Sequence, residues 1–246
     1  MDNQKIRDFY ETDIKEKFGD DYEAQRWFGT KLFRERYRMM EGAINYQIKD
    51  IKYRSCFELG PGPGTWTKLL LNHSADSFYK LLDISGEMHR QFQRKIGILP
   101  NIDYQIGDFE NYKDEKTYDF FFSSRAIEYI ADKEKAVENI GNILSPGKEG
   151  MIITKTPHYF KKKVLFQDTP WQHKNQIKPG ELKKLLRKYN FQDIRFYPAI
   201  IYVPLLGRLN IINRIIWNLV YKIRLNFITQ FISEAYLVKF AKTKEI

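Results

Sequence analysis

The sequence predicts an α/β fold with a seven-stranded, mostly parallel sheet and helices on both faces. Short apolar runs alternate along the chain with segments of helical periodicity, as in parallel sheets whose strands are joined by helices. Several runs, such as FYKLLDI at 78–84, are largely apolar on both faces, which suits covered strands. The first run, 55–59, leads into three glycines at alternate positions. Because ligands of such sheets bind beyond the carboxyl ends of the strands, this turn marks the predicted site.

The predicted elements follow one another along the chain. The helices are predicted at 65–72, 85–96, 131–144 and 179–189, with Ser85 capping the second. The segment Ser145-Pro146-Gly147 is expected to end the third helix. The predicted strands are 55–59, 78–84, 102–106, 118–123, 151–156, 191–202 and 235–241.

Residues 1–48 are predicted to form an N-terminal helical extension, and residues 49–246 the α/β domain. In the extension, charged and aromatic residues alternate, and Gly19 and Gly29 mark breaks between helices. Two roles stay open for the extension: packing on the domain, or acting as a flap over the site.

The net charge of +10 favours anionic partners, whether nucleic acid, phosphorylated substrates or an acidic membrane surface. The single cysteine, Cys56, cannot form an internal disulfide, which fits a reducing compartment and excludes a cysteine-based metal site. The N-terminus leads into a charged stretch without the apolar region of a secretory signal. We therefore expect a cytoplasmic location.

The glycine-rich turn runs Glu58-Leu59-Gly60-Pro61-Gly62-Pro63-Gly64. Its glycines allow a sharp turn and a close approach of a ligand to the backbone. A dinucleotide fingerprint would need a third glycine where this chain has Thr65 or Thr67. The spacing therefore disfavours NAD and FAD.

Five segments between residues 56 and 154 together resemble the class I S-adenosylmethionine-dependent methyltransferases, whose fold is Rossmann-like. The first is the glycine turn. The second and third are acidic residues at the ends of consecutive strands, Asp83 and Asp108. The fourth spans 118–130, and the fifth is the Leu-Ser-Pro-Gly turn at 144–147 before a strand. The resemblance implies an enzyme that transfers a methyl group from S-adenosylmethionine.

The resemblance also assigns the cofactor site. Asp83 would accept hydrogen bonds from both ribose hydroxyls, and Asp108 would accept one from the adenine amino group. The backbone of the glycine turn would lie along the methionine portion. The implied cofactor-binding residues are Glu58, Gly60, Gly62, Gly64, Asp83, Ile84, Asp108, Phe109 and Ser124.

Methyl transfer from a sulfonium needs no metal, and the four histidines have no ligand-like spacing. If the acceptor is a hydroxyl, a base should assist its attack. His158, which follows the fifth strand, is the first candidate for this base and His173 the second, although each could equally be a plain loop residue. Arg125 would either bind an anionic acceptor or form a structural ion pair.

Residues 203–232 are expected to form an amphipathic helical insertion that is basic and rich in aromatic residues. Its charges are too frequent for a confident transmembrane span. Three roles stay open: contact with an anionic membrane surface, a lid over the acceptor, or a homodimer interface. On a helix, one apolar stripe would contain Ile212, Ile216, Leu219, Ile223 and Phe227.

The expected acceptor is a small molecule, a glycan or a lipid-linked compound that is methylated on oxygen or carbon. Nucleic acid is disfavoured, because this chain has Ser123-Ser124-Arg125-Ala126 where adenine-N6 methyltransferases carry Asn/Asp-Pro-Pro-aromatic. If membrane contact occurs, the protein would be peripheral on the inner face of a membrane. The rival hypothesis is a non-catalytic, membrane-associated binding or regulatory module on the same fold.

Overall fold

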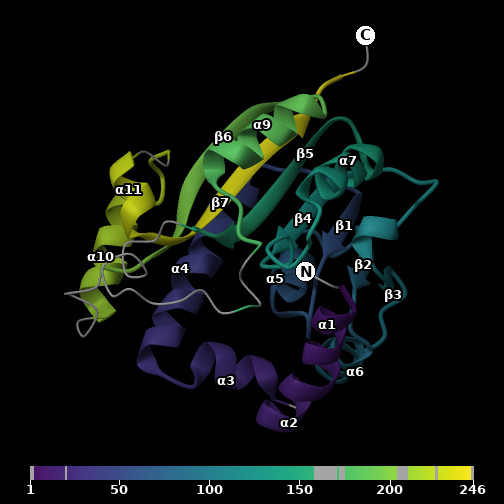
Figure 1. Ribbon diagram of the computed structural model, residues 1–246, viewed down its shortest axis with the longest axis horizontal. Helices are drawn as coiled ribbons and strands as arrows, with labels where there is room; N and C mark the ends of the chain where they lie inside the picture. Colours follow the sequence, from purple (N-terminus) through teal and green to yellow (C-terminus); the bar gives the residue numbers. More distant parts are fainter. Residues whose placement is uncertain are drawn as a thin grey trace.

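The computed structural model describes residues 3–19, 21–157, 171, 175–203, 210–224 and 227–244. Seven strands form one sheet in the order β3-β2-β1-β4-β5-β7-β6 (Figure 1). Of these strands, β7 runs antiparallel to its two neighbours, and the other pairs are parallel, as the sequence predicts. The strands are β1 Ser55–Leu59, β2 Phe78–Asp83, β3 Ile102–Ile106, β4 Tyr118–Ser124, β5 Leu144–Lys155, β6 Phe191–Ile201 and β7 Ser233–Lys242.

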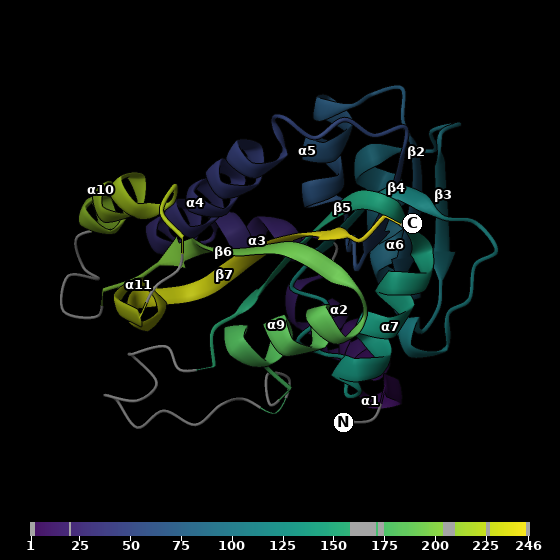
Figure 2. The ribbon, with the colours of Figure 1, turned by 90° about the horizontal axis from the view of Figure 1, so that it is seen from above.

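Helices cover both faces of the sheet. Figure 2 shows α4, α5 and α10 on one side and α7 and α9 on the other. Their bounds are α4 Lys31–Ile48, α5 Thr65–His73, α6 Gly86–Ile96, α7 Lys133–Ile143, α9 Pro179–Lys188, α10 Asn210–Val220 and α11 Phe227–Ile232. The predicted cap of α6 is confirmed, since the Ser85 hydroxyl accepts a hydrogen bond from the backbone amide of Met88.

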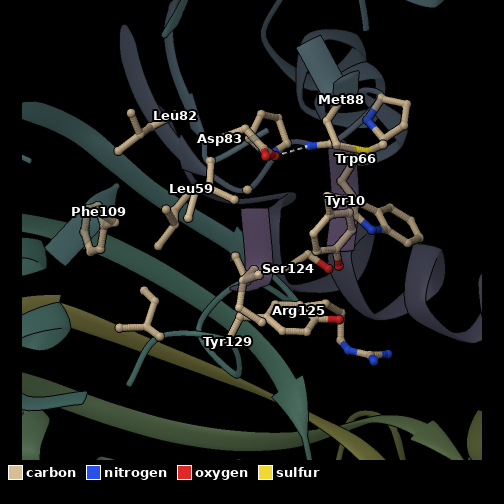
Figure 3. Close-up of a pocket in the computed structure, with 18 of the residues that line it drawn as sticks. Tyr10, Leu59, Trp66, Leu82, Asp83, Met88, Phe109, Ser124, Arg125 and Tyr129 are labelled. Atoms are coloured by element: carbon tan, nitrogen blue, oxygen red, sulfur yellow. Dashed lines mark hydrogen bonds between the residues drawn. The ribbon is translucent and has the colours of Figure 1, made fainter. Parts of the chain in front are cut away.

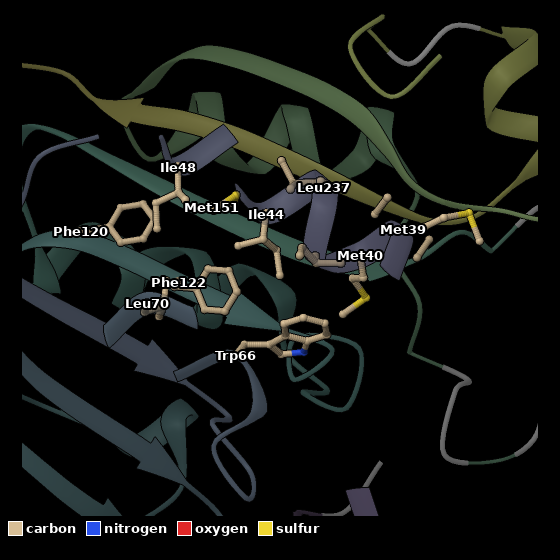
Figure 4. Close-up of a cluster of buried hydrophobic side chains, with 14 of the residues drawn as sticks. Met39, Met40, Ile44, Ile48, Trp66, Leu70, Phe120, Phe122, Met151 and Leu237 are labelled. Atoms are coloured by element: carbon tan, nitrogen blue, oxygen red, sulfur yellow. The ribbon is translucent and has the colours of Figure 1, made fainter. Parts of the chain in front are cut away.

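Two apolar clusters fill the space between the helices and the sheet. One joins α4 and α5 to the sheet through side chains such as Ile44, Leu70 and Phe122 (Figure 4). The other lies on the opposite face and includes Phe57, Ile140 and Leu182. Strands that are buried on both faces explain why the strand runs in the sequence are so apolar.

The prediction for Ser145-Pro146-Gly147 was wrong. Helix α7 ends at Ile143, and these three residues lie inside β5 instead of between a helix and a strand. Leu144 pairs with Tyr118, and the register then shifts so that Glu149 pairs with Phe120. The proline therefore lies at an irregularity of the ladder, where strands tolerate it.

The N-terminal extension is helical and lies against α6. It consists of α1 Asn3–Asp8, a π-helical turn η1 Phe9–Asp13, α2 Ile14–Phe18 and α3 Tyr22–Phe28, which leads to α4 (Figure 1). One carboxylate oxygen of Glu11 accepts hydrogen bonds from the Ser85 hydroxyl and from the amides of Gly86 and Glu87. These groups form the N-terminus of α6, where a negative charge is favourable. The extension is thereby fixed next to the end of β2.

Helix α10 packs on α4 and β6. The indole of Trp217 is 5% exposed and donates a hydrogen bond to the Ala199 carbonyl over 3.1 Å. Gly42 on α4 makes room for it, because a Cβ there would lie 2.5 Å from the ring. The predicted apolar stripe is split, since Ile216 is partly buried whereas Leu219 and Ile223 are 70% and 50% exposed. In the part of the chain described, no helix is long and apolar enough to cross a bilayer.

Candidate active site

The glycine turn leaves the end of β1 in a backbone conformation that favours glycine. Gly60, Gly62 and Gly64 have φ angles of +70°, +55° and +89°. A Cβ at Gly60 would lie 2.4 Å from the Cβ of Ala126, and one at Gly64 would lie 2.7 Å from Cγ1 of Ile96. Two of the three glycines are therefore required by close packing as well as by the backbone.

A cavity lies at the carboxyl ends of β1, β2 and β4 (Figure 3). Glu58 and Gly64, which the sequence also assigns to the cofactor site, do not line it. The structure brings the other predicted cofactor residues together around it: Gly60, Gly62, Asp83, Ile84, Asp108, Phe109 and Ser124.

The Asp83 carboxylate faces this cavity at the end of β2 and is 8% exposed. Its two oxygens accept hydrogen bonds from the amides of Gly62 and Ser85, each over 3.0 Å. Burial raises the pKa of Asp83 to about 6, although the backbone hydrogen bonds oppose the shift. Each carboxylate oxygen can accept a further bond, so the pair suits a vicinal diol.

Asp108 lines the cavity as well, after β3. One oxygen accepts a hydrogen bond from the amide of Glu110, and the other accepts from the side-chain amides of Asn3 and Asn111, each over 2.8 Å. Asn3 belongs to α1, so the N-terminal extension reaches this carboxylate. The carboxylate that the sequence assigns to the adenine amino group thus already accepts hydrogen bonds from two side-chain amides.

Glu58 lies behind the turn. Its side chain is buried and accepts a hydrogen bond from the Thr67 hydroxyl over 2.7 Å, which ties β1 to α5. Burial raises the pKa of Glu58 to about 8. Glu58 thus contacts α5 and does not line the cavity.

The raised pKa of Glu58 predicts a pH-dependent stability. A carboxyl group whose pKa is higher in the folded than in the unfolded protein destabilises the fold as pH rises between the two values. For Glu58 that window runs from 4.5 to about 8. We expect the Tm of Glu58→Gln to match that of the wild type at about pH 5 and to exceed it by several degrees at about pH 9. Differential scanning calorimetry without ligand measures this, with the exposed Glu115→Gln as control. An equal difference at both pH values would contradict the prediction.

Arg125 forms an ion pair. Its Nε lies 3.0 and 3.1 Å from the two carboxylate oxygens of Glu128, which is fully buried. Of the two roles predicted for Arg125, the structure therefore shows the ion pair, and the residue still lines the cavity. His158 and His173 lie outside the described residues.

The N-terminal extension contributes cavity residues that the sequence patterns did not identify. Tyr10, Tyr22, Glu23 and Arg26 line the cavity opposite the strand ends. Figure 3 shows Tyr10 and Tyr129 reaching it from elements far apart in the sequence. Their rings lie edge to face at 5.8 Å, and their hydroxyl groups are hydrogen-bonded. The alternation of charged and aromatic residues was the only signal of these positions in the sequence.

A second cavity adjoins the first. It lies between η1, α2, α3 and α4 on one side and β5, β6 and β7 on the other. Five residues line both cavities: Tyr10, Tyr22, Arg26, Arg125 and Tyr129. Two ligands bound in the two cavities would therefore meet at these side chains.

Known proteins share both the sequence pattern and the fold. Residues 57–147 match the family model of a methyltransferase domain. A SAM-dependent methyltransferase of Thermotoga maritima superposes with a TM-score of 0.66 at 18% identity, covering 94% of this chain and 99% of that one. The N-methyltransferase NodS of Bradyrhizobium japonicum, solved with S-adenosylhomocysteine, gives 0.64 at 11% identity over 95% and 98%. Residues 57–147 thus match a methyltransferase domain, and the chain shares its fold with S-adenosylmethionine-dependent methyltransferases.

Curated relatives match part of the chain. Malonyl-[acyl-carrier protein] O-methyltransferase 2 of Ilyobacter polytropus is 32% identical over 110 residues, which are 45% of this chain and 40% of that protein. Trans-aconitate 2-methyltransferase of Rhodopseudomonas palustris is 26% identical over 171 residues, or 67% and 60%. The chain thus spans less than two thirds of the length of either relative.

The first cavity fits S-adenosylmethionine. Asp83 supplies acceptor oxygens on its wall, and the backbone at Gly62 of the glycine turn is open to the ligand. The Ser124 hydroxyl lines the cavity, is buried, and has no hydrogen-bond partner among the described residues. A buried hydroxyl without a partner is costly, and a bound ligand would satisfy it.

Proposed function

We propose that this protein is a methyltransferase that transfers the methyl group of S-adenosylmethionine to an oxygen atom of a small-molecule acceptor. The acceptor would bind in the second cavity. The observation that carries this proposal is the set of side chains that line both cavities, among them Tyr10, Arg26 and Tyr129. They lie beside Ser124 and Arg125, where the methyl group is expected.

The relatives support an oxygen acceptor on a small molecule. One is named as an O-methyltransferase of malonyl-[acyl-carrier protein], and another as a methyltransferase of trans-aconitate. Neither name points to nucleic acid, which agrees with the residues that follow β4.

In the proposed reaction, the acceptor oxygen attacks the methyl carbon in line with the sulfur that leaves. The sulfonium is already activated, so the protein contributes mainly alignment, which can lower a barrier by several kcal/mol. Tyr10 and Tyr22 would help to exclude water from the shared wall of the cavities. A hydroxyl acceptor would need a base, for which His158 and His173 stay our candidates; a carboxylate would need none.

Several apolar side chains on α10 and after it are exposed. They are Ile215, Leu219, Ile223 and Ile228. A membrane or a second copy of the chain would bind through them. Since Trp217 and Asn213 of the same helix are buried, the helix has a role in the fold without either partner. The proposed function therefore requires neither membrane contact nor a dimer.

Binding and transfer can be tested directly with the full chain. Isothermal titration with S-adenosylhomocysteine is expected to give one site with a Kd in the micromolar range, typical of such a pocket. S-adenosylmethionine with a labelled methyl group is expected to pass label to small molecules. Absence of binding would favour the non-catalytic module, and binding without any transfer to small molecules would contradict the proposed acceptor.

A further inference from the structure

The second cavity is basic and aromatic. Its volume of about 620 Å³ suits a small molecule. Five basic residues line it, against two acidic ones, Asp13 and Glu234. Glu234 forms an ion pair with Arg36 over 2.6 Å, and Arg125 pairs with Glu128. The other charged residues of the wall are Lys17, Arg26, Lys155 and Asp13, so its net charge is positive. The basic residues are Lys17, Arg26, Arg36, Arg125 and Lys155, and the aromatic ones include Phe9, Phe18, Trp27 and Phe33.

Arg26 is placed on the wall between the two cavities. Its guanidinium lies over the rings of Tyr22 and Trp27, at 5.5 and 5.0 Å from their centres. Its acidic neighbour is Glu23, at 3.6 Å, which is longer than a direct hydrogen bond. The other carboxylate oxygen of Glu23 accepts a hydrogen bond from Thr65. Rings thus contact the faces of the guanidinium, and since no described residue accepts a hydrogen bond from it, its donors are available to a ligand.

A second donor lies beside it. The indole of Trp27 is buried on the wall of the second cavity, and its Nε1 has no hydrogen-bond partner among the described residues. A buried N–H without a partner is unfavourable, and an acceptor atom in the cavity would satisfy it. The two neighbouring residues therefore both favour an anionic oxygen.

We propose that the acceptor is a carboxylate, bound by the guanidinium of Arg26 and the indole N–H of Trp27, and that the product is its methyl ester. This inference rests on the proposed function and specifies its substrate class. Arginine is suited to a carboxylate because its parallel N–H groups match the two oxygens. The aromatic side chains of the cavity would hold the apolar body of the acid.

The reaction balances without a base. A lone pair of a carboxylate oxygen forms the new bond to the methyl carbon, and the S–CH₃ bond breaks with its electron pair going to sulfur. The negative carboxylate and the positive sulfonium become a neutral ester and the neutral thioether of S-adenosylhomocysteine, and no proton moves. The ester no longer pairs with Arg26, which favours release of the product.

The tyrosines at the shared wall fit this chemistry. Burial raises the pKa of Tyr129 to about 12 and that of Tyr10 well above its usual value, so both hydroxyls stay protonated at neutral pH. They cannot act as bases, and since one hydroxyl donates to the other, the pair has one O–H left to donate to an acceptor. A carboxylate acceptor needs donors of this kind and no base.

The linkage of the transferred methyl group tests the proposal even while the individual acid is unidentified. The full chain is incubated with methyl-labelled S-adenosylmethionine and the low-molecular-mass fraction of a cell extract. Methyl esters release volatile labelled methanol in mild alkali, whereas ethers and C-methyl or N-methyl products keep the label. We expect the label to be alkali-labile. Alkali-stable label would overturn the carboxylate and leave the proposed function intact, and no label at all would overturn both.

Variants test the role of Arg26 as a binding residue. Arg26→Gln is expected to lower kcat/KM for the alkali-labile product about 100-fold, mainly through KM, because one charged bidentate contact is lost. Binding of S-adenosylhomocysteine should be retained, which also shows that the variant folds. The matched control is Arg38→Gln on the exposed side of α4, where Arg38 pairs with Glu35. Saturated turnover should be flat between about pH 7 and 9, since no base titrates. Normal kcat/KM in Arg26→Gln would overturn the assignment.

Discussion

Asp83→Ala is expected to weaken the binding of S-adenosylhomocysteine by at least about 100-fold, because two hydrogen bonds from ribose to a buried carboxylate are lost. The carboxylate is positioned for this role by the amides of Gly62 and Ser85. Isothermal titration of the variant and the wild type at about pH 8 measures the loss, since Asp83 is then ionised.

Two further variants make this result specific. Asp83→Asn keeps the shape of the side chain but replaces one acceptor by a donor, so its affinity should lie between those of Asp83→Ala and the wild type. Asp76→Ala removes an exposed carboxylate and should bind as the wild type does. Wild-type affinity in Asp83→Ala would show that the carboxylate does not hold the cofactor.

Trp217→Ala is expected to lower the free energy of unfolding by about 3–5 kcal/mol, the usual cost of removing a buried large aromatic side chain. The indole fills the space over Gly42, stacks on Tyr221 at 4.4 Å and donates to the Ala199 carbonyl. Urea denaturation followed by circular dichroism measures the change.

The neighbouring Leu219→Ala provides the control. Leu219 lies on the exposed side of the same helix, and its truncation should change the free energy of unfolding by no more than about 0.5 kcal/mol. If both variants were as stable as the wild type, α10 would not belong to the core. Its role would then lie with an external partner such as a membrane or a second copy of the chain.

The fold and the cofactor side of the site could be predicted from the sequence because their determinants are local. Strand runs that are buried on both faces are recognisable by composition. Asp83 ends one such run, β2, and Asp108 lies two residues after the edge strand β3. Since the carboxyl ends of neighbouring parallel strands meet at one edge of the sheet, residues at those ends must come together. Local patterns failed at Ser145-Pro146-Gly147, because the pairing of β5 with β4 incorporates a segment that reads as a turn.

The sequence by itself determined the mostly parallel sheet, the glycine turn and two acidic residues that line the first cavity. Only the tertiary structure decided what lies opposite them. Tyr10 and Arg26 reach the cavities because the extension is fixed to α6 by Glu11, a contact between segments far apart along the chain. Glu58 and Trp217 likewise owe their burial to distant elements. The periodicity of the sequence cannot predict such contacts, since they depend on how helices pack on a completed sheet.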